Sequence, residues 1–540
     1  MKVTEKVKPW LETAKTPEEV GVSSKVLQEF VDACMEKNKE LHSFMVIRHG
    51  KIACEVYREP FAREYKHMMY SVSKSFTSTA IGFAINEGYF DVDTRFVDIF
   101  PEARGDKEDE YLEEMTVEDL LTMRSGKSVS VFLDRTKDRW FKDIINSPWI
   151  SEPGTEFLYI SENMYLLCCI IHKMTGMSVM DYLKPRLFEP LGIENAFWET
   201  CPRGIEAGGW GLMVSLEDLA KYIYCYQQMG KFNGKQVIPE EWVKVSTAYH
   251  ADNSASQQDS DCVVGYGYCF WRNGGYEKSY RADGMFCQFG IVFEDLDACF
   301  ISLGGEVHEQ GMRDVVWEYF PKAFIEPDAK AESVPVSIPA YPKAPVKPRS
   351  LALESRISEK KIRFRKPVVI NMVGYPVSVV PLPALFMESD KAGNISEVTF
   401  RFGDDDMYMT WVEGDEINTV HIGLDGEYRW DNIVIGKIPY TTCSTGCWNS
   451  ESELEVHIRC IEVPSERVIK FKINGDNVIM RPSSNPDVGV MAETLKETVK
   501  DVIKQPVFQT AVSKALPHLV PIIDSVQRGK IKVDTAGRKR

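Results

Sequence analysis

Short runs rich in apolar residues predict strands near both ends of the first part of the chain. Residues 44–48 and 51–56 are strand-like runs split by His49-Gly50, which predicts a β-hairpin. Residues 287–292 and 298–303 predict a second pair of adjacent strands, joined by an acidic turn. These two pairs are expected to belong to one antiparallel sheet.

Helical periodicity dominates between those strands. Residues 73–87 and 164–175 carry apolar side chains at helical spacing, and Gly88 and Gly176 follow them as stop signals. Strands at both ends with helices between them predict an α+β fold, with a helical cluster covering the sheet. We therefore expect residues 1–326 to form the first domain.

The amino-acid composition and the predicted elements change after residue 326. Proline recurs every few positions in residues 327–350, which predicts an extended, semi-rigid linker that joins domains and does not build a core. Residues 351–485 contain short alternating strands and the hairpin dipeptides Asp425-Gly426 and Asn474-Gly475, so we expect an all-β barrel or sandwich module. Residues 486–540 carry a helical stripe and predict a helical tail.

Composition and charge narrow the kinds of molecule and cellular location expected for this protein. The 540 residues include 64 Lys and Arg against 80 Asp and Glu, a formal net charge of -16, which disfavours nucleic acid. The apolar stretch 368–387 is interrupted by proline and glycine, so we expect no membrane span. The charged N-terminus has no apolar signal region and the 13 cysteines are scattered, which favours a cytoplasmic location with free thiols. Cys443 and Cys447 have metal-like spacing, but no second Cys or His pair follows them.

Candidate chemistry begins with Ser71-Val-Ser-Lys74 at the start of the expected 73–87 helix. The i, i+3 spacing puts both side chains on one helical face, within hydrogen-bond reach. A buried lysine at a helix N-terminus can lose its proton near neutral pH and act as base for a serine nucleophile. The alternative is an ordinary N-cap serine. A second Ser-x-x-Lys pattern, at Ser358, lies in a charged segment and is interpreted as chance.

A tyrosine is the second candidate. Pro153-Gly154 predicts a turn, a short extended segment follows, and Tyr159 then lies at the entrance to the 164–175 helix. A phenol beside an ammonium group can relay a proton. The alternative is a half-buried tyrosine next to a helix cap.

Taken together, these motifs resemble the serine β-lactamase and penicillin-binding-protein superfamily, in the branch of class C β-lactamases, D-Ala-D-Ala peptidases, family VIII esterases and nylon-oligomer hydrolases. The resemblance covers residues 15 to 325. Six ordered segments carry it: residues 16–23, 70–77, 120–126, 153–167, 208–220 and 282–288. It implies a β-lactamase/transpeptidase-like domain with Ser71 as acylated nucleophile, Lys74 as its partner and Tyr159 as third catalytic residue, without a metal or organic cofactor.

The resemblance also implies substrate-binding positions. Ser161 stands where the family has an asparagine in its second motif, and Trp210 lies in a glycine-rich loop that could line the cleft or simply pack. By analogy, the backbone N–H groups of Ser71 and Met285 would form the oxyanion hole, and Gly284 would let substrate approach the strand closely.

The third motif departs from the family pattern. It reads Ala282-Asp283-Gly284, without the usual cation at its first position, although Arg281 stands one residue earlier. That cation helps relatives bind a substrate carboxylate, so its loss favours esters or neutral amides. Two neighbouring residues are not expected to be catalytic. His67 lies close to Ser71 in sequence but could as easily be a surface side chain, and Cys287 is expected in the core.

The sequence therefore predicts a cytoplasmic serine hydrolase that cleaves a small-molecule ester or amide through an acyl-enzyme. Two alternatives stay open: a β-lactamase or penicillin-binding peptidase, and a catalytically silent binding protein on the same fold. Neither nucleic acid nor membrane is expected as a partner, and the formation of a homo-oligomer is left open.

Overall fold

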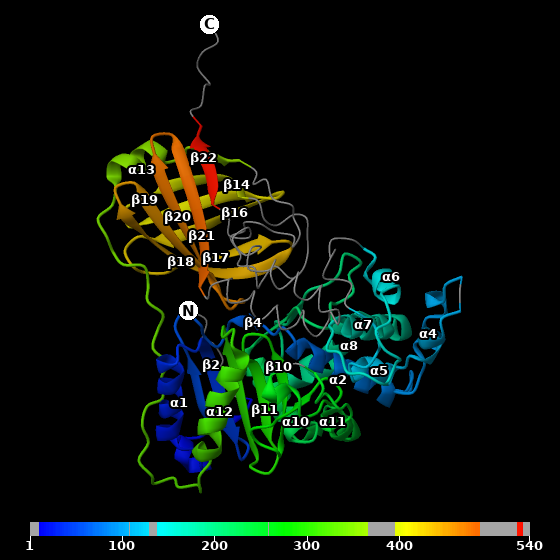
Figure 1. Ribbon diagram of the computed structural model, residues 1–540. Coiled ribbons are helices and arrows are strands. Elements are labelled where there is room, and N and C mark those ends of the chain that lie inside the picture. Colours follow the sequence, from blue (N-terminus) through cyan, green and yellow to red (C-terminus); the bar gives the residue numbers. More distant parts are fainter. Residues whose placement is uncertain are drawn as a thin grey trace.

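The computed structural model describes residues 10–106, 108–128, 138–256, 259–365, 395–485 and 526–532. An N-terminal domain of mixed helices and strands is followed by a linker and a C-terminal barrel (Figure 1). Within these residues, no helix has both the length and the apolar character needed to cross a membrane.

A seven-stranded sheet in the order β1-β3-β2-β12-β11-β10-β9 forms the centre of the N-terminal domain. Its neighbours pair antiparallel except β1 and β3, which are parallel. The strands are β1 (Glu12–Thr13), β2 (Leu41–Arg48), β3 (Lys51–Tyr57), β9 (Trp271–Arg272), β10 (Ser279–Gly284), β11 (Gln288–Phe293) and β12 (Ala298–Gly304). Both strand pairs predicted from the sequence are present. The β2–β3 turn uses His49 and Gly50 at φ 50° and 70°.

Helices cover both faces of this sheet (Figure 1). On one face α1 (Ser24–Glu36) packs against α12 (Glu309–Ala323), and Phe30 and Phe320 lie edge to face with centroids 5.2 Å apart. The other face carries the larger core, with α2 (Val72–Asn86), α7 (Glu162–Thr175) and α10 (Leu216–Gln227). The remaining helices are α3 (Phe96–Ile99), α4 (Glu110–Glu114), α5 (Val117–Leu121), α6 (Trp140–Ile145), α8 (Val179–Leu183), α9 (Glu189–Leu191), α11 (Glu240–Thr247) and α13 (Leu351–Ile357).

A small sheet in the order β4-β6-β5 leads into α2. Its strands are β4 (Lys66–Met68), β5 (Phe197–Trp198) and β6 (Leu212–Ser215), and β7 (Lys231–Phe232) and β8 (Lys235–Gln236) form a separate hairpin. β4 lies on the side of the N-terminal domain that faces the barrel (Figure 1). The chain therefore enters α2 from a strand located at the junction of the two domains.

The C-terminal module is a barrel, which settles the choice between barrel and sandwich. Nine described strands follow one another in the order β16-β15-β14-β13-β22-β21-β20-β19-β18, and a bridge between β16 and β18 closes the ring, with β17 paired outside it. The strands are β13 (Ile362–Phe364), β14 (Ile395–Phe402), β15 (Asp406–Glu413), β16 (Glu416–Gly423), β17 (Arg429–Ile435), β18 (Ile438–Ser450), β19 (Glu453–Cys460), β20 (Glu466–Asn474), β21 (Asn477–Asn485) and β22 (Gln527–Ile531). Alternate residues of β15 and β20 are buried, because one face of each strand lines the barrel core.

Two expectations about the C-terminal half need correction. Asn474-Gly475 joins the paired strands β20 and β21, but Asp425-Gly426 connects β16 to β17, which are not paired with each other. Residues 527–531, expected in a helical tail, form β22 because Gln527, Gly529 and Ile531 alternate into the barrel. The rest of the expected helical tail, apart from residues 526 and 532, lies outside the described residues.

The linker is extended but contributes to packing, contrary to expectation. Ile338, Tyr341 and Ala344 are each less than 10% exposed. Ile338 joins the core beneath α1 and α12, and Tyr341 packs with Phe61 in a small cluster that the barrel completes. The proline-rich segment therefore bridges the two domains through buried side chains as well as through the chain itself.

Candidate active site

Ser71 lies between β4 and α2, immediately after a residue in an unusual conformation. Tyr70 adopts φ 45°, in the left-handed region that side chains disfavour. Ser71 is the N-cap residue of α2, yet its side chain makes no cap hydrogen bond. Its hydroxyl instead receives a hydrogen bond from Lys74 Nζ at 2.8 Å. The Ser71 side chain therefore does not act as an ordinary N-cap, and its hydroxyl faces the lysine instead.

Lys74 is buried, with 1% of its surface exposed, and its ammonium has three oxygen partners. Nζ donates to Ser71 Oγ at 2.8 Å, to Ser161 Oγ at 3.1 Å and to the Gly209 carbonyl at 2.7 Å. Burial lowers the pKa of Lys74 from 10.5 to about 7, against smaller opposing effects of nearby acidic groups. A lysine in this position is largely neutral at slightly alkaline pH.

Tyr159 approaches the same amine from a loop. The centroid of its ring lies 4.8 Å from Lys74 Nζ. Trp271 and Tyr266 hold the ring, with centroids 5.0 Å and 6.1 Å from it. Burial raises the pKa of Tyr159 well above its ordinary value, and a hydrogen bond with the Ser71 side chain offsets this in part. The phenol is therefore neutral at pH 7, and the neighbouring amine does not turn it into a phenolate.

The glycine-rich loop before β6 contributes its backbone to the site. A Cβ on Gly209 would lie 2.6 Å from the Ser161 Cβ, so glycine is required for the loop to reach Lys74. Trp210 itself is 5% exposed and packs 6.0 Å from Trp140, centroid to centroid, within the larger core. Sequence reasoning singled out the tryptophan and missed the Gly209 carbonyl, for which the paired glycines were the available signal.

Strand alternation explains why Arg281 does not replace the missing cation of the third motif. Arg281 is fully buried, and its Nε donates to Asp283 at 2.6 Å on the same face of β10. The same guanidinium donates to the Asp261 carbonyl, and Arg313 adds a second charge 3.5 Å from Asp283. Ala282 and Gly284 have the opposite orientation. The charge of Arg281 is therefore used inside the protein.

Gly284 allows two backbone segments to meet beside Ser71. A Cβ at Gly284 would lie 2.2 Å from the Met69 carbonyl oxygen, so the close approach expected for substrate is made here by the protein's own chain. Met285 follows and is partly buried. In the described part of the chain, no hydrogen bond occupies the backbone N–H of Ser71 or of Met285. Both N–H groups are therefore available for a ligand oxygen.

Other candidates lie elsewhere or have other partners. His67 is buried rather than at the surface, with its Nε2 3.0 Å from His42 Nδ1, because β4 is covered by the barrel. Cys287 is buried in the core, as expected. Among the described residues, no group of three or more His, Cys, Asp or Glu could hold a metal ion.

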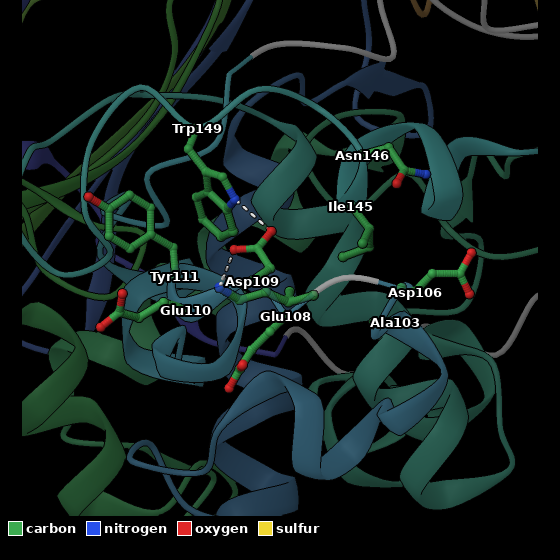
Figure 2. Close-up of a pocket in the computed structure, with 11 residues that line it drawn as sticks. Ala103, Asp106, Glu108, Asp109, Glu110, Tyr111, Ile145, Asn146 and Trp149 are labelled. Atoms are coloured by element: carbon green, nitrogen blue, oxygen red, sulfur yellow. Dashed lines mark hydrogen bonds between the residues drawn. The ribbon is translucent and has the colours of Figure 1, made fainter.

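An open cavity of about 700 Å³ lies in the helical region, beside α4 (Figure 2). Its lining is acidic, including Asp106, Glu108 and Asp109, and Trp149 Nε1 donates to Asp109 Oδ2 at 2.9 Å. Its described lining contains none of the site residues predicted from the sequence. The side chains around Ser71 thus form a separate site.

Comparisons with known proteins find a matching family model and a curated relative. The model of the beta-lactamase family matches residues 27–310. A curated relative, the 6-aminohexanoate-dimer hydrolase of Paenarthrobacter ureafaciens, is 25% identical over 229 residues, which are 37% of this chain and 56% of that protein. The chain thus matches little more than half the length of this relative.

Several solved structures are also similar. A putative 6-aminohexanoate-dimer hydrolase from Bacillus anthracis has 18% identity and a TM-score of 0.46, over 58% of this chain and 88% of that one. A family VIII carboxylesterase has 17% identity and a TM-score of 0.46, over 57% and 98%. The octameric penicillin-binding protein homologue from Pyrococcus abyssi has 16% identity and a TM-score of 0.45, over 84% and 97%.

Proposed function

The chain belongs to the beta-lactamase family, and from that premise we propose that it is a serine hydrolase, cleaving an ester or neutral amide through an acyl-enzyme on Ser71. One observation carries the proposal: Nζ of the buried Lys74, whose pKa is about 7, lies 2.8 Å from Ser71 Oγ, and this hydroxyl makes no helix-capping hydrogen bond. A serine hydroxyl needs a nearby base to become a nucleophile.

Lys74 acts as that base in its neutral form. A neutral amine has two N–H groups and one lone pair. The Gly209 carbonyl can only accept, so it takes one N–H, and Ser161 Oγ accepts the other. The lone pair is then left for the Ser71 O–H. The proton moves to Lys74 Nζ as Ser71 Oγ bonds to the carbonyl carbon of the substrate.

Tyr159 completes the proton path as a neutral phenol. It donates its proton to the leaving group and takes one from the Lys74 ammonium, so the leaving bond breaks without charge building up on the departing atom. In the second half of the reaction, a water molecule gives its proton to the same pair and attacks the acyl carbon. Ser71 and the free acid are restored, and each proton taken from Ser71 or water is returned.

Two backbone N–H groups would stabilise the oxyanion. Those of Ser71 and Met285 face no described protein acceptor and flank the point where the two backbone segments meet. Donors aimed at developing charge in a buried site contribute strongly to catalysis, roughly 100- to 1,000-fold in rate for each. We assign them to the substrate carbonyl oxygen.

The substrate is proposed to be uncharged near the third motif. Ala282 offers no charge, and Arg281 is committed to Asp283. A substrate carboxylate would find no free cation on this strand, whereas a neutral ester or amide needs no such charge to bind. Penicillins and peptides ending in a carboxylate are therefore expected to be poor substrates.

The test is Ser71→Ala in the full chain. We expect it to abolish hydrolysis of short p-nitrophenyl esters and labelling by a fluorophosphonate probe, while the melting temperature stays near that of the wild type. Near-normal turnover in this variant would end the proposal. Rapid nitrocefin hydrolysis by the wild type would favour a β-lactamase instead, and a wild type that neither labels nor hydrolyses would favour a silent binding protein.

A further inference from the structure

Two backbone arms meet beside Ser71, and both contain a strained residue. The first arm is Met69-Tyr70 before Ser71, and the second is Met285-Phe286 after β10. Tyr70 has φ 45° and Phe286 has φ 65°, in a region that L residues with large side chains avoid. Such conformations persist when the surrounding structure holds them in place.

The two strained residues hold one another and enter the barrel core. Their rings lie 5.1 Å apart, centroid to centroid, and Tyr70 is 3% exposed and Phe286 1%. Both belong to the same continuous cluster of buried apolar side chains that fills the barrel, and Met285 packs against that cluster. The arms of the proposed oxyanion hole are therefore embedded in the second domain.

Further contacts tie the first arm to the barrel. The N–H of Met68 donates to the Glu462 carbonyl at 2.7 Å, across the domain junction. Tyr440 on β18 is 1% exposed and belongs to the same cluster of buried side chains as Tyr70 and Phe286. A Cβ on Gly305 would also lie 2.7 Å from the Pro464 carbonyl oxygen, so the domains touch backbone to backbone.

The N-terminal domain holds the second arm from its own side. Glu309 accepts a hydrogen bond from the Phe286 N–H at 3.0 Å. Gln288 Nε2 donates to the carbonyls of Met285 and Phe286, both at 3.1 Å. These bonds fix the backbone of the turn, while the ring of Phe286 points into apolar contacts shared with the barrel.

We infer that the C-terminal barrel positions the oxyanion hole, with Tyr440 as a positioning residue that keeps Tyr70 and Phe286 in their strained conformations. The inference deepens the proposed function and rests on it. It gives the barrel a part in catalysis without any contact with substrate. Loosening the barrel contact is expected to displace the N–H groups of Ser71 and Met285, which act on the transition state rather than on bound substrate.

The experiment compares four full-length proteins: wild type, Tyr440→Ala, Tyr440→Phe and Phe471→Ala. Phe471 is the matched control, because it is also fully buried in the barrel core but pairs with Leu454, at the opposite end of β19 from the junction. Each protein is assayed well below its melting temperature for p-nitrophenyl ester kinetics, fluorophosphonate labelling, and hydrogen exchange of segments 66–74 and 282–290. Tyr440→Leu replaces Tyr440→Ala if that variant does not fold.

Tyr440→Ala is expected to lower kcat and the labelling rate about 10- to 100-fold with little change in KM, and to accelerate exchange in both segments. Tyr440→Phe, which keeps the ring, should restore both readouts, and Phe471→Ala should change neither beyond its loss of thermal stability. Equal exchange in Tyr440→Ala and Phe471→Ala would overturn the inference even for an inactive protein. Inactivity of the wild type would instead count against the proposed function alone.

Discussion

The rate of acylation of Ser71 should follow the titration of Lys74. Burial lowers the pKa of this lysine from 10.5 to about 7. A shift of that size is worth roughly 5 kcal/mol of preference for the neutral amine, at about 1.4 kcal/mol per pKa unit. Because the neutral form is the proposed base, activity should rise with pH through about 7 and then level off.

The expected change is large enough to measure. With a pKa of about 7, roughly three quarters of the lysines are neutral at about pH 7.5 and about 3% at about pH 5.5, so the rate should fall about 25-fold. A solvent-exposed lysine would be only about 0.1% neutral at about pH 7.5, and its rate would still be climbing at about pH 10. The position of the inflection therefore reports whether Lys74 titrates as a buried group.

The assay is the second-order rate of fluorophosphonate labelling between about pH 5.5 and 10, with Ser71→Ala as background. Circular dichroism at each pH checks that the protein stays folded. Lys74→Met should label about 100- to 10,000-fold more slowly and lose the inflection near neutrality, because a general base contributes about that much. A flat profile in the wild type, or one that rises without a plateau to about pH 10, would refute the reasoning.

Three further predictions concern neighbouring groups. Tyr159→Phe removes the proton relay and should lower kcat for p-nitrophenyl esters about 100-fold with an unchanged melting temperature; wild-type turnover would exclude the relay. Gly284→Ala places a Cβ 2.2 Å from the Met69 carbonyl oxygen and should abolish fluorophosphonate labelling. Gly105→Ala is the control, because no atom lies within 4 Å of its new Cβ, and it should label normally. Similar labelling of the two variants would contradict the close approach of the two backbone segments at Gly284. Burial lowers the pKa of His67 to about 4, so on acidification the unfolded state binds this proton before the folded state does. The free energy of unfolding should therefore fall by about 3 kcal/mol as the pH drops from about 6.5 to 4. Urea unfolding of wild type and His67→Gln measures this, and the same pH dependence in both proteins would contradict the prediction.

The local part of the site could be predicted from sequence because it depends on helical geometry. Ser71 and Lys74 are three residues apart at the start of a helix, and an i, i+3 pair on a helix lies on one face whatever surrounds it. The strands around His49-Gly50 and Asn474-Gly475 were predictable for a similar reason, since Gly50 and Gly475 supply the positive φ values that tight turns need.

Other features depended on contacts between distant segments. The role of Arg281 could not be predicted, because its partners Asp261 and Arg313 come from elsewhere in the chain and only the folded sheet shows which face of β10 it occupies. The burial of His67 could not be predicted for a similar reason: the barrel that buries β4 lies far along the sequence. The strand formed by residues 527–531 lies in a segment whose surroundings predicted helix, and its pairing with β13 and β21 decides its conformation.

The sequence by itself determined which reactive groups the chain carries, the local elements that hold them, and its membership of a family with a known fold. The tertiary structure decided the protonation of Lys74, the partner of Arg281, and the contact between the barrel and the arms beside Ser71. The physical reason is that periodicity along the chain fixes only the direction of a side chain relative to its own element. Desolvation and long-range contact depend on which other elements cover it, and these are set when the whole molecule packs.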